Sequence, residues 1–287
     1  MSQKSKGILF IVMSAFFFAL MNLFVKLSGD LPSMQKSFFR NLVALIFALV
    51  ILLRSEEKFA FHRKNLPILF ARSIFGTIGI LCNYYAVTHL LLPDASMLGK
   101  LSPFFAILVS YLYLKEKVTP MQAGSVVIAF IGALFIIKPG FTAFTQFFPC
   151  IIGALGGLGA GTAYTMVRKL SLNGERGPFI VFFFSTFSCL FCLPYLLLFY
   201  APMSPYQLAM LLCAGLAASG GQFSVTAAYS NAPARELSIY DYSQVIFAAI
   251  MELMFFQQLP DVWSVVGYII ICGISIFMFF YNRRQPA

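Results

Sequence analysis

Residues 7–28 read GILFIVMSAFFFALMNLFVKLS, a run whose single charge, Lys26, comes near its end. A helix needs about 20 apolar residues to cross the hydrocarbon core of a bilayer, and this run has that length. Nine similar runs follow, and 60% of all residues are apolar, against roughly 45–50% in a soluble domain. Since backbone groups in lipid must be hydrogen-bonded within their own segment, the runs predict an all-α integral membrane protein. The ten predicted transmembrane helices are residues 7–28, 35–53, 66–88, 93–114, 120–138, 149–169, 178–199, 205–230, 236–256 and 262–281.

Basic residues collect in the connections on one side of the predicted bundle. Of the 20 Lys and Arg, 14 lie in connections on the side of the N-terminus, whereas the opposite connections hold only Lys26, Lys36 and Lys138. Cytoplasmic loops carry such an excess, so we expect a cytoplasmic-membrane protein with both termini in the cytoplasm. The net charge of +10 follows from this bias. No basic stripe with base-stacking aromatic residues indicates a nucleic-acid partner.

The two halves of the chain share residues at an offset of 142 or 143 positions. Lys26-Leu27-Ser28 corresponds to Lys169-Leu170-Ser171, and Phe105-Ala106 corresponds to Phe247-Ala248. We therefore predict a first repeat at 1–145 and a second at 146–287, each with five helices. Because five is odd, the second repeat must cross the membrane in the opposite direction. Inverted repeats are typical of secondary transporters, whose sites lie near the bilayer midplane where the repeats meet.

Four charged residues are predicted to lie deep in the membrane: Arg72, Lys100, Asp241 and Glu252. A charge at this depth costs roughly 2.5–3.5 kcal/mol on insertion scales and marks a functional site by default. At about 1.5 Å of rise per residue, Arg72 and Asp241 come at similar heights near the cytoplasmic ends of their helices. Lys100 and Glu252 come at similar heights near the outer ends. This predicts an inner gating pair, Arg72–Asp241, and an outer gating pair, Lys100–Glu252. Permanent structural pairing, snorkelling to the interface, and substrate contact by Lys100 or Asp241 remain open.

Neutral polar side chains recur on single faces of several predicted helices. Asn, Gln and Tyr can orient a polar metabolite while aromatic faces cover its apolar part. Interhelical hydrogen bonding is the alternative use of the same side chains. Together with Lys100 and Asp241, the candidate substrate-binding residues are Asn22, Asn83, Tyr84, Thr165, Gln222, Thr226, Tyr242 and Gln244.

Small residues and capping motifs predict where helices pack and begin. Gly153, Gly157 and Gly161 lie on one helix face and allow a neighbouring backbone to approach closely. Residues 119–122 (TPMQ) and 204–207 (SPYQ) each place a hydroxyl residue, a proline and a glutamine at the spacing of a capping box. We therefore expect helices to begin at the two prolines.

Two stretches occupy matching places in the two halves. Residues 95–124 read ASMLGKLSPFFAILVSYLYLKEKVTPMQAG, and residues 241–267 read DYSQVIFAAIMELMFFQQLPDVWSVVG. In these stretches the chain resembles the EamA family of the drug/metabolite transporter superfamily, and the resemblance extends over nearly the whole sequence. It implies ten helices in two inverted five-helix repeats. It also implies a central cavity walled by the first, third, fourth, sixth, eighth and ninth helices.

These patterns predict a secondary carrier that moves a small polar metabolite by alternating access and is not an enzyme. With Arg40, the deep charges sum to three cations and two carboxylates, which favours an amino acid or a related carboxylate-bearing substrate. A membrane-embedded enzyme acting on a lipid-soluble substrate and a channel are the alternatives. The two histidines form no H-E-x-x-H zinc motif, and no pore loop or charge ring indicates a channel.

The sequence also predicts that no cofactor takes part. Cys189 and Cys192 form a C-x-x-C inside an apolar run without a second ligand pair, so we interpret them as small apolar residues. No nucleotide-binding motif indicates direct use of ATP. The expected partners are therefore the substrate and the lipid bilayer, and the sequence leaves both a monomer and a homodimer open.

Overall fold

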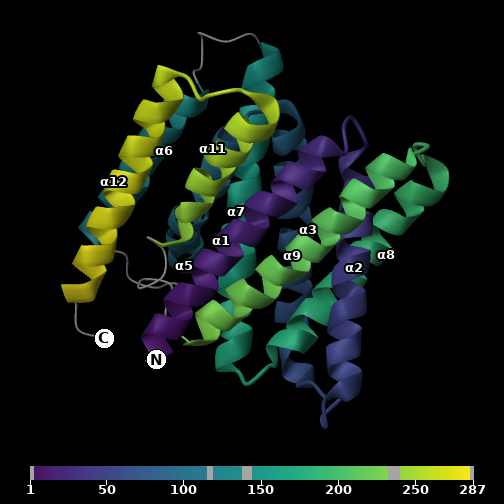
Figure 1. The fold of residues 1–287 in the computed structure, drawn as a ribbon. Helices are drawn as coiled ribbons and strands as arrows, with labels where there is room; N and C mark the ends of the chain where they lie inside the picture. Colours follow the sequence, from purple (N-terminus) through teal and green to yellow (C-terminus); the bar gives the residue numbers. More distant parts are fainter. Residues whose placement is uncertain (1–2, 115–118, 138–143, 232–239, 285–287) are drawn as a thin grey trace.

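The structure, a computed structural model, describes residues 3–114, 119–137, 144–231 and 240–284. In these ranges the chain forms helices joined by turns and short loops (Figure 1). A short 3-10 turn, Arg63–Asn65, precedes the third helix. The helices are α1 (Gln3–Leu27), α2 (Ser33–Arg54), α3 (Leu66–His89), α4 (Leu92–Gly99), α5 (Ser102–Leu114), α6 (Pro120–Ile137), α7 (Phe144–Leu172), α8 (Gly177–Leu198), α9 (Pro205–Asn231), α11 (Ser243–Phe256) and α12 (Val262–Arg284).

The described helices have the length and composition of membrane spans. Eight of them are long and apolar enough to cross a bilayer: α1, α2, α3, α6, α7, α8, α9 and α12. α11 is a shorter apolar helix. Large apolar side chains lie exposed on these helices, such as Leu197 at 76% and Ile269 at 66%, and form a surface suited to lipid. The prediction of an all-helical, multi-pass membrane protein is therefore confirmed for the described ranges.

The prediction of one continuous helix at 93–114 is wrong, because this segment is interrupted. Lys100 and Leu101 form a turn between α4 and α5. The physical cause is Pro103, whose nitrogen has no proton to donate to the carbonyl of Gly99 four positions earlier. The segment therefore consists of two shorter helices with a polar turn between them.

The predicted helix at 236–256 is also interrupted in its described part. Asp241 ends a short helical segment, Tyr242 forms a turn, and α11 follows. Residues 236–239 lie outside the described ranges, as does Lys138. Tyr242 comes 142 positions after Lys100, so the two interruptions occupy matching positions in the two halves of the sequence.

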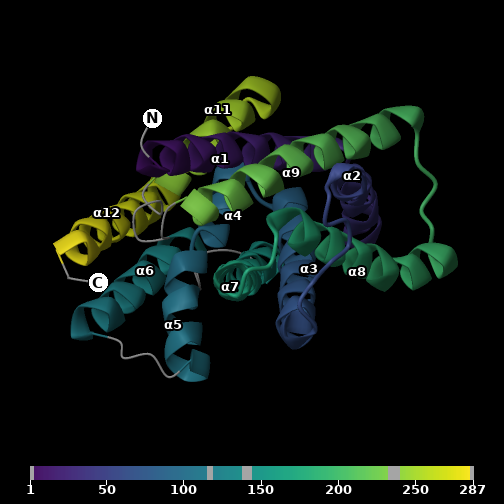
Figure 2. The same cartoon turned by 90° about the horizontal axis from the view of Figure 1, so that it is seen from below.

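The packing of the helices follows the same correspondence between halves. α1 packs on α9 and α11, and its counterpart α7 packs on α3 and on α4 and α5. α2 packs on α9, and its counterpart α8 packs on α3. Two other large contacts, α2 with α8 and α6 with α12, each join a helix to its own counterpart. Figure 1 and Figure 2 show these neighbours side by side, with α1 beginning and α12 ending at the same end of the bundle.

The glycine row of residues 153–161 places α7 directly against the α4–α5 interruption. A Cβ atom added at Gly157 would lie 2.7 Å from the carbonyl oxygen of Leu98, and one added at Gly161 would overlap the carbonyl oxygen of Ser102. Both added atoms would lie closer to these oxygens than a carbon–oxygen contact allows. The predicted packing role is therefore confirmed, and the close contact lies at the turn that carries Lys100.

We expect Gly161→Ala to destabilise the protein by about 1–3 kcal/mol, the usual cost of overpacking a well-packed contact. The measurement is the thermal melting temperature of the purified protein in detergent. Gly273→Ala on α12 is the matched control, because an added Cβ there would meet no atom within 4 Å. Equal losses in the two variants would contradict the packing argument.

Both predicted capping boxes are confirmed. The Thr119 backbone N–H donates to the Gln122 side chain at 2.9 Å, and the Gln122 N–H donates to the Thr119 hydroxyl at 3.3 Å. Ser204 and Gln207 form the same reciprocal pair at 2.9 and 3.2 Å. Two backbone donors that a helix start leaves unpaired are thereby satisfied at each site, and α6 and α9 begin where predicted.

Candidate functional site

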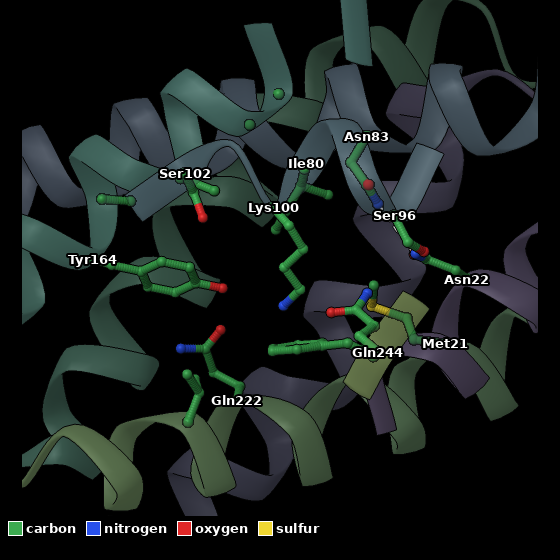
Figure 3. A pocket seen from close by; sticks show the side chains of 18 of the residues that line it. Met21, Asn22, Ile80, Asn83, Ser96, Lys100, Ser102, Tyr164, Gln222 and Gln244 are labelled. Carbon is green, nitrogen blue, oxygen red and sulfur yellow. Dashed lines mark hydrogen bonds between the residues drawn. The ribbon is translucent and has the colours of Figure 1, made fainter. Parts of the chain in front are cut away.

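A cavity of about 120 Å³ lies inside the bundle. Its wall comes from α1, α2, α3, α7, α8, α9 and the two interrupted segments, so both halves of the chain contribute. Figure 3 shows the side chains of Lys100, Tyr164, Gln222 and Gln244 converging on this space. An interior space with a few convergent polar groups is the default candidate for a ligand site.

An ion pair joins the two interrupted segments in this cavity. The Lys100 ammonium lies 2.7 Å from a carboxylate oxygen of Asp241, and the two side chains are 10% and 13% exposed. Near the turn, the Phe104 N–H bonds to the Leu101 carbonyl, so the Lys100 carbonyl loses that helical partner. The Tyr242 hydroxyl donates to the Lys100 carbonyl at 3.1 Å and replaces the lost bond.

Two arginines lie on the cavity wall beside the ring of Phe184 in α8. Arg40 of α2 and Arg72 of α3 are each 2% exposed. Their guanidinium carbons lie 5.8 Å and 3.9 Å from the ring centroid. The ring quadrupole attracts a cation at such distances, so Phe184 orients both groups. Gly76 leaves room for them, because a Cβ there would overlap the Arg72 guanidinium.

Neutral polar groups complete the wall. The Asn83 amide of α3 donates to the Asn22 side-chain oxygen of α1 at 3.1 Å. Gln222, Gln244 and Tyr164 reach in from α9, α11 and α7 (Figure 3). Amides and hydroxyls both donate and accept hydrogen bonds. The wall therefore offers a ligand hydrogen-bond donors and acceptors in addition to charged groups.

The structure brings together part of the predicted substrate-binding set. Thr165 and Thr226 do not line the cavity, and each donates to a carbonyl one turn earlier in its own helix, at 2.9 and 2.8 Å. Tyr84 is fully buried outside the cavity wall, and Tyr242 supports the α4–α5 turn. Helical periodicity identifies a face, but only part of a face borders the cavity. The predicted residues that do line it are Asn22, Asn83, Lys100, Gln222, Asp241 and Gln244.

Other lining residues were not predicted as substrate-binding: Arg40, Tyr164, Phe184, Ser96 and Ser102. A signal existed for Arg40, which is a cation within a predicted span. Tyr164 directly precedes the predicted Thr165. Phe184 offered no signal, because it is one of 34 phenylalanines in the chain.

A second buried ion pair lies at the end of the bundle where α1 ends. The Glu252 side chain is 0% exposed and pairs with the Lys26 ammonium at 2.5 Å. Glu252 also accepts the Leu92 backbone N–H at 3.1 Å. The Lys26 ammonium donates to the Leu90 carbonyl at 3.2 Å and lies 4.5 Å from the Phe256 ring centroid. This cluster ties α1 and the start of α4 to α11.

The structure does not bring together the predicted gating pairs Arg72–Asp241 and Lys100–Glu252. Asp241 pairs with Lys100 and Glu252 with Lys26, whereas Arg72 has no carboxylate of the described residues within 4.0 Å. The predicted partners were paired because they come at similar heights along their helices. A similar height does not show that the two helices are neighbours. α1 packs on α11 and α4 packs on α11, and these contacts bring the observed partners together.

Polar contacts between the two halves also occur at the opposite end of the bundle. The Glu175 side chain, which is 2% exposed, accepts the His62 backbone N–H at 2.7 Å and the Asn65 amide at 3.0 Å. Next to it, Arg176 pairs with the exposed Glu57 at 3.0 Å. The connection between α2 and α3 is thereby joined to the connection between α7 and α8.

The paired cysteines lie at the contact of α8 with α2. Cys189 and Cys192 are buried and have free thiols. The Cys189 sulfur lies 3.8 Å from the Phe38 carbonyl, and the Cys192 sulfur lies 3.9 Å from the Met34 sulfur. Within the described ranges, no group of three or more His, Cys, Asp or Glu side chains is placed to hold a metal ion.

Comparison with known proteins places this chain among membrane transporters. The profile of the EamA-like transporter family matches residues 5–138 and again residues 147–280. The pseudopaline exporter CntI of Pseudomonas aeruginosa is 30% identical over 92% of this chain and 93% of its own length. Human solute carrier family 35 member G1 is 25% identical over 94% of this chain and 78% of its own length. A riboflavin transporter of Brucella anthropi is 26% identical over 86% of this chain and 88% of its own length.

The fold is also similar to that of a solved crystal structure. The match covers 99% of both chains with a TM-score of 0.70 at 12% sequence identity. At that identity the likeness concerns the fold alone.

Proposed function

Because this chain belongs to the EamA-like transporter family, we propose that it is a secondary carrier that moves a small carboxylate-bearing metabolite, such as an amino acid or a related compound, across the cytoplasmic membrane. One observation carries the substrate class. Of the residues that the structure describes, the cations Arg40, Arg72 and Lys100 and a single carboxylate, Asp241, line the cavity shared by the two halves. A net positive wall favours a ligand of negative charge.

We further propose that the chain forms ten membrane crossings in two inverted five-helix repeats, at 1–145 and 146–287. The family profile matches the chain twice, in ranges close to these boundaries. The largest contacts between helices remain the same when each helix is exchanged for its counterpart. α1 begins and α12 ends at one end of the bundle, which agrees with an even number of crossings (Figure 1). The excess of basic residues on that side favours its placement in the cytoplasm.

Such repeats supply the two states that alternating access needs. Lys26–Glu252 joins the halves at one end of the bundle, and the Glu175 cluster joins them at the other. We propose that these contacts break in turn, so that the cavity opens to one side and then to the other. Lys100–Asp241 lies between them and holds the two interrupted segments together while the cavity is closed.

Counterflow in proteoliposomes tests this function. We expect saturable uptake of at least one labelled compound from a panel of amino acids, monocarboxylates, dicarboxylates and riboflavin. Unlabelled compound inside the vesicles should accelerate it, because a carrier returns faster when it is loaded. Protein-free vesicles and the variant Lys100→Met are the controls.

Two results would contradict a carrier. Non-saturable flux with single-channel currents would indicate a channel. Conversion of a panel compound by the detergent-solubilised protein, without a second compartment, would indicate an enzyme. Absence of counterflow for every carboxylate in the panel would reject the proposed substrate class.

A further inference from the structure

The charges that line the cavity do not balance. Arg40, Arg72 and Lys100 are cations, and Asp241, which pairs with Lys100, is the one carboxylate among the described residues of the wall. No carboxylate of the described residues lies within 4.0 Å of either guanidinium. Buried charges in proteins are normally paired, because an isolated one is costly to remove from water. The wall therefore carries two positive charges without a partner in the part of the chain that the structure describes.

Three donor atoms of these two arginines are also unsatisfied among the described residues. Arg40 Nε, Arg72 Nε and Arg72 Nη1 are buried and have no hydrogen-bond partner among the described residues. Arg40 Nη1 donates to the Asn41 side chain at 2.5 Å, which fixes that group against α2. A buried donor left unpaired costs about 1–3 kcal/mol, and more when it is charged. Donors held rigidly on a cavity wall at this cost point to a ligand that accepts their hydrogen bonds.

The geometry separates the positive charge into two places. Arg40 and Arg72 flank the Phe184 ring, and Arg72 occupies the room that Gly76 leaves. Lys100 lies on the α4–α5 turn and is engaged with Asp241. An arginine fork suits a carboxylate, which it can bind through two parallel hydrogen bonds. A ligand with carboxylates at two separate ends can neutralise this wall, because one end can meet the arginines and the other can meet Lys100.

We propose that the substrate is a small dicarboxylate. One carboxylate is bound by Arg40 and Arg72, and the other competes with Asp241 for the Lys100 ammonium. The cavity volume of about 120 Å³ is somewhat smaller than the roughly 150 Å³ of an apolar cavity that accepts benzene. A cavity of this size admits only a small molecule. The inference rests on the proposed function and specifies the substrate class of the same site.

The second contact has a consequence for transport. Lys100–Asp241 joins the interrupted segments of the two halves. A carboxylate that takes Lys100 from Asp241 weakens that connection at the moment when the site is loaded. Substrate binding would thereby release the two halves to move relative to each other, as coupled transport requires.

Thermal-shift titration of the purified full-length protein in detergent tests the proposal. A ligand that binds only the folded state raises the melting temperature, and the titration yields an apparent affinity. The probes are succinate, butyrate, glutamine and inorganic phosphate. Butyrate is the matched probe, because it has the four-carbon chain of succinate with one carboxylate. We expect succinate to bind at least about tenfold more tightly than each of the other three, the effect of roughly one charge-assisted hydrogen bond.

Variants locate the binding site. Arg40→Gln and Arg72→Gln should each weaken the apparent affinity for succinate by about tenfold or more. Arg168→Gln removes an exposed arginine of α7 outside the cavity and should leave the affinity unchanged. If an arginine variant does not fold, the four probes on the unmodified protein still decide the substrate class.

Three outcomes would overturn the proposal. Butyrate or glutamine could match succinate, phosphate could bind while succinate does not, or the arginine variants could keep full affinity. Counterflow of a monocarboxylate or a neutral amino acid would leave the carrier function intact and reject the dicarboxylate. Tight succinate binding without counterflow would support the dicarboxylate site and reject the carrier function.

Discussion

Asp241→Asn should destabilise the protein by about 3 kcal/mol and lower the transport rate roughly 100-fold, because it leaves the buried Lys100 ammonium without its partner. This is the lower end of the cost of removing one member of a buried pair, since both side chains keep some exposure to the cavity. Lys100→Met should have a similar effect by leaving Asp241 unpaired. The melting temperature and the rate of counterflow are the two measurements.

Exchange of the two charges separates pairing from other roles. The double variant Lys100→Asp/Asp241→Lys restores an ion pair between the interrupted segments, so its melting temperature should exceed that of either single variant. Its transport should stay low, because the cation that meets the substrate has moved to the other segment. Glu56→Gln and Lys64→Met remove exposed charges and serve as controls. A double variant no more stable than the single variants would show that the pair does not couple the two halves.

Binding and turnover should respond differently in Asp241→Asn. If a substrate carboxylate competes with Asp241 for Lys100, the removal of Asp241 frees the ammonium for the ligand. The apparent affinity for succinate should then rise while the rate of counterflow falls. A merely structural role of Asp241 would lower both together.

The second large effect is expected at the Lys26–Glu252 pair. Glu252→Gln should destabilise the protein by about 3–5 kcal/mol, because Glu252 is fully buried and neutralises Lys26. The glutamine amide keeps an oxygen that can accept the Leu92 N–H. The loss of stability therefore measures mainly the removal of the negative charge and not the loss of this hydrogen bond. The double variant Lys26→Met/Glu252→Gln should recover part of the stability, since no uncompensated charge remains.

An exposed ion pair is the matched control. Glu57 pairs with Arg176 and is 67% exposed. Surface pairs of this kind contribute about 0–1 kcal/mol, so Glu57→Gln should shift the melting temperature little. If Glu57→Gln is as damaging as Glu252→Gln, burial does not determine the importance of these pairs.

Local chemistry explains which parts of the fold were predictable. The capping boxes at Thr119 and Ser204 work within one helix turn, so the starts of α6 and α9 could be predicted. The close packing of Gly161 follows from its place on a row of small residues. The interruption at Lys100 had a signal in Pro103, but apolar length alone hides a two-residue turn inside a span.

The candidate site was predictable only in part. Asn83, Gln222 and Gln244 carry polar groups in apolar helices, and such groups tend to face a cavity or a neighbour, so periodicity identified them. Thr226 has the same signal but bonds to its own helix instead. Arg40 and Arg72 come from different helices, and nothing in the spacing of either helix shows that both meet the ring of Phe184.

The sequence by itself determined the membrane-spanning helices, their matching order in two halves and the presence of buried charges. These properties depend on length, composition and spacing along one chain. Only the tertiary structure decided which charges are partners: Lys100 meets Asp241, Lys26 meets Glu252, and Arg40 and Arg72 have no carboxylate partner among the described residues. The reason is that an ion pair needs atoms within a few ångströms in three dimensions, and a helix specifies height along its axis but not its neighbours.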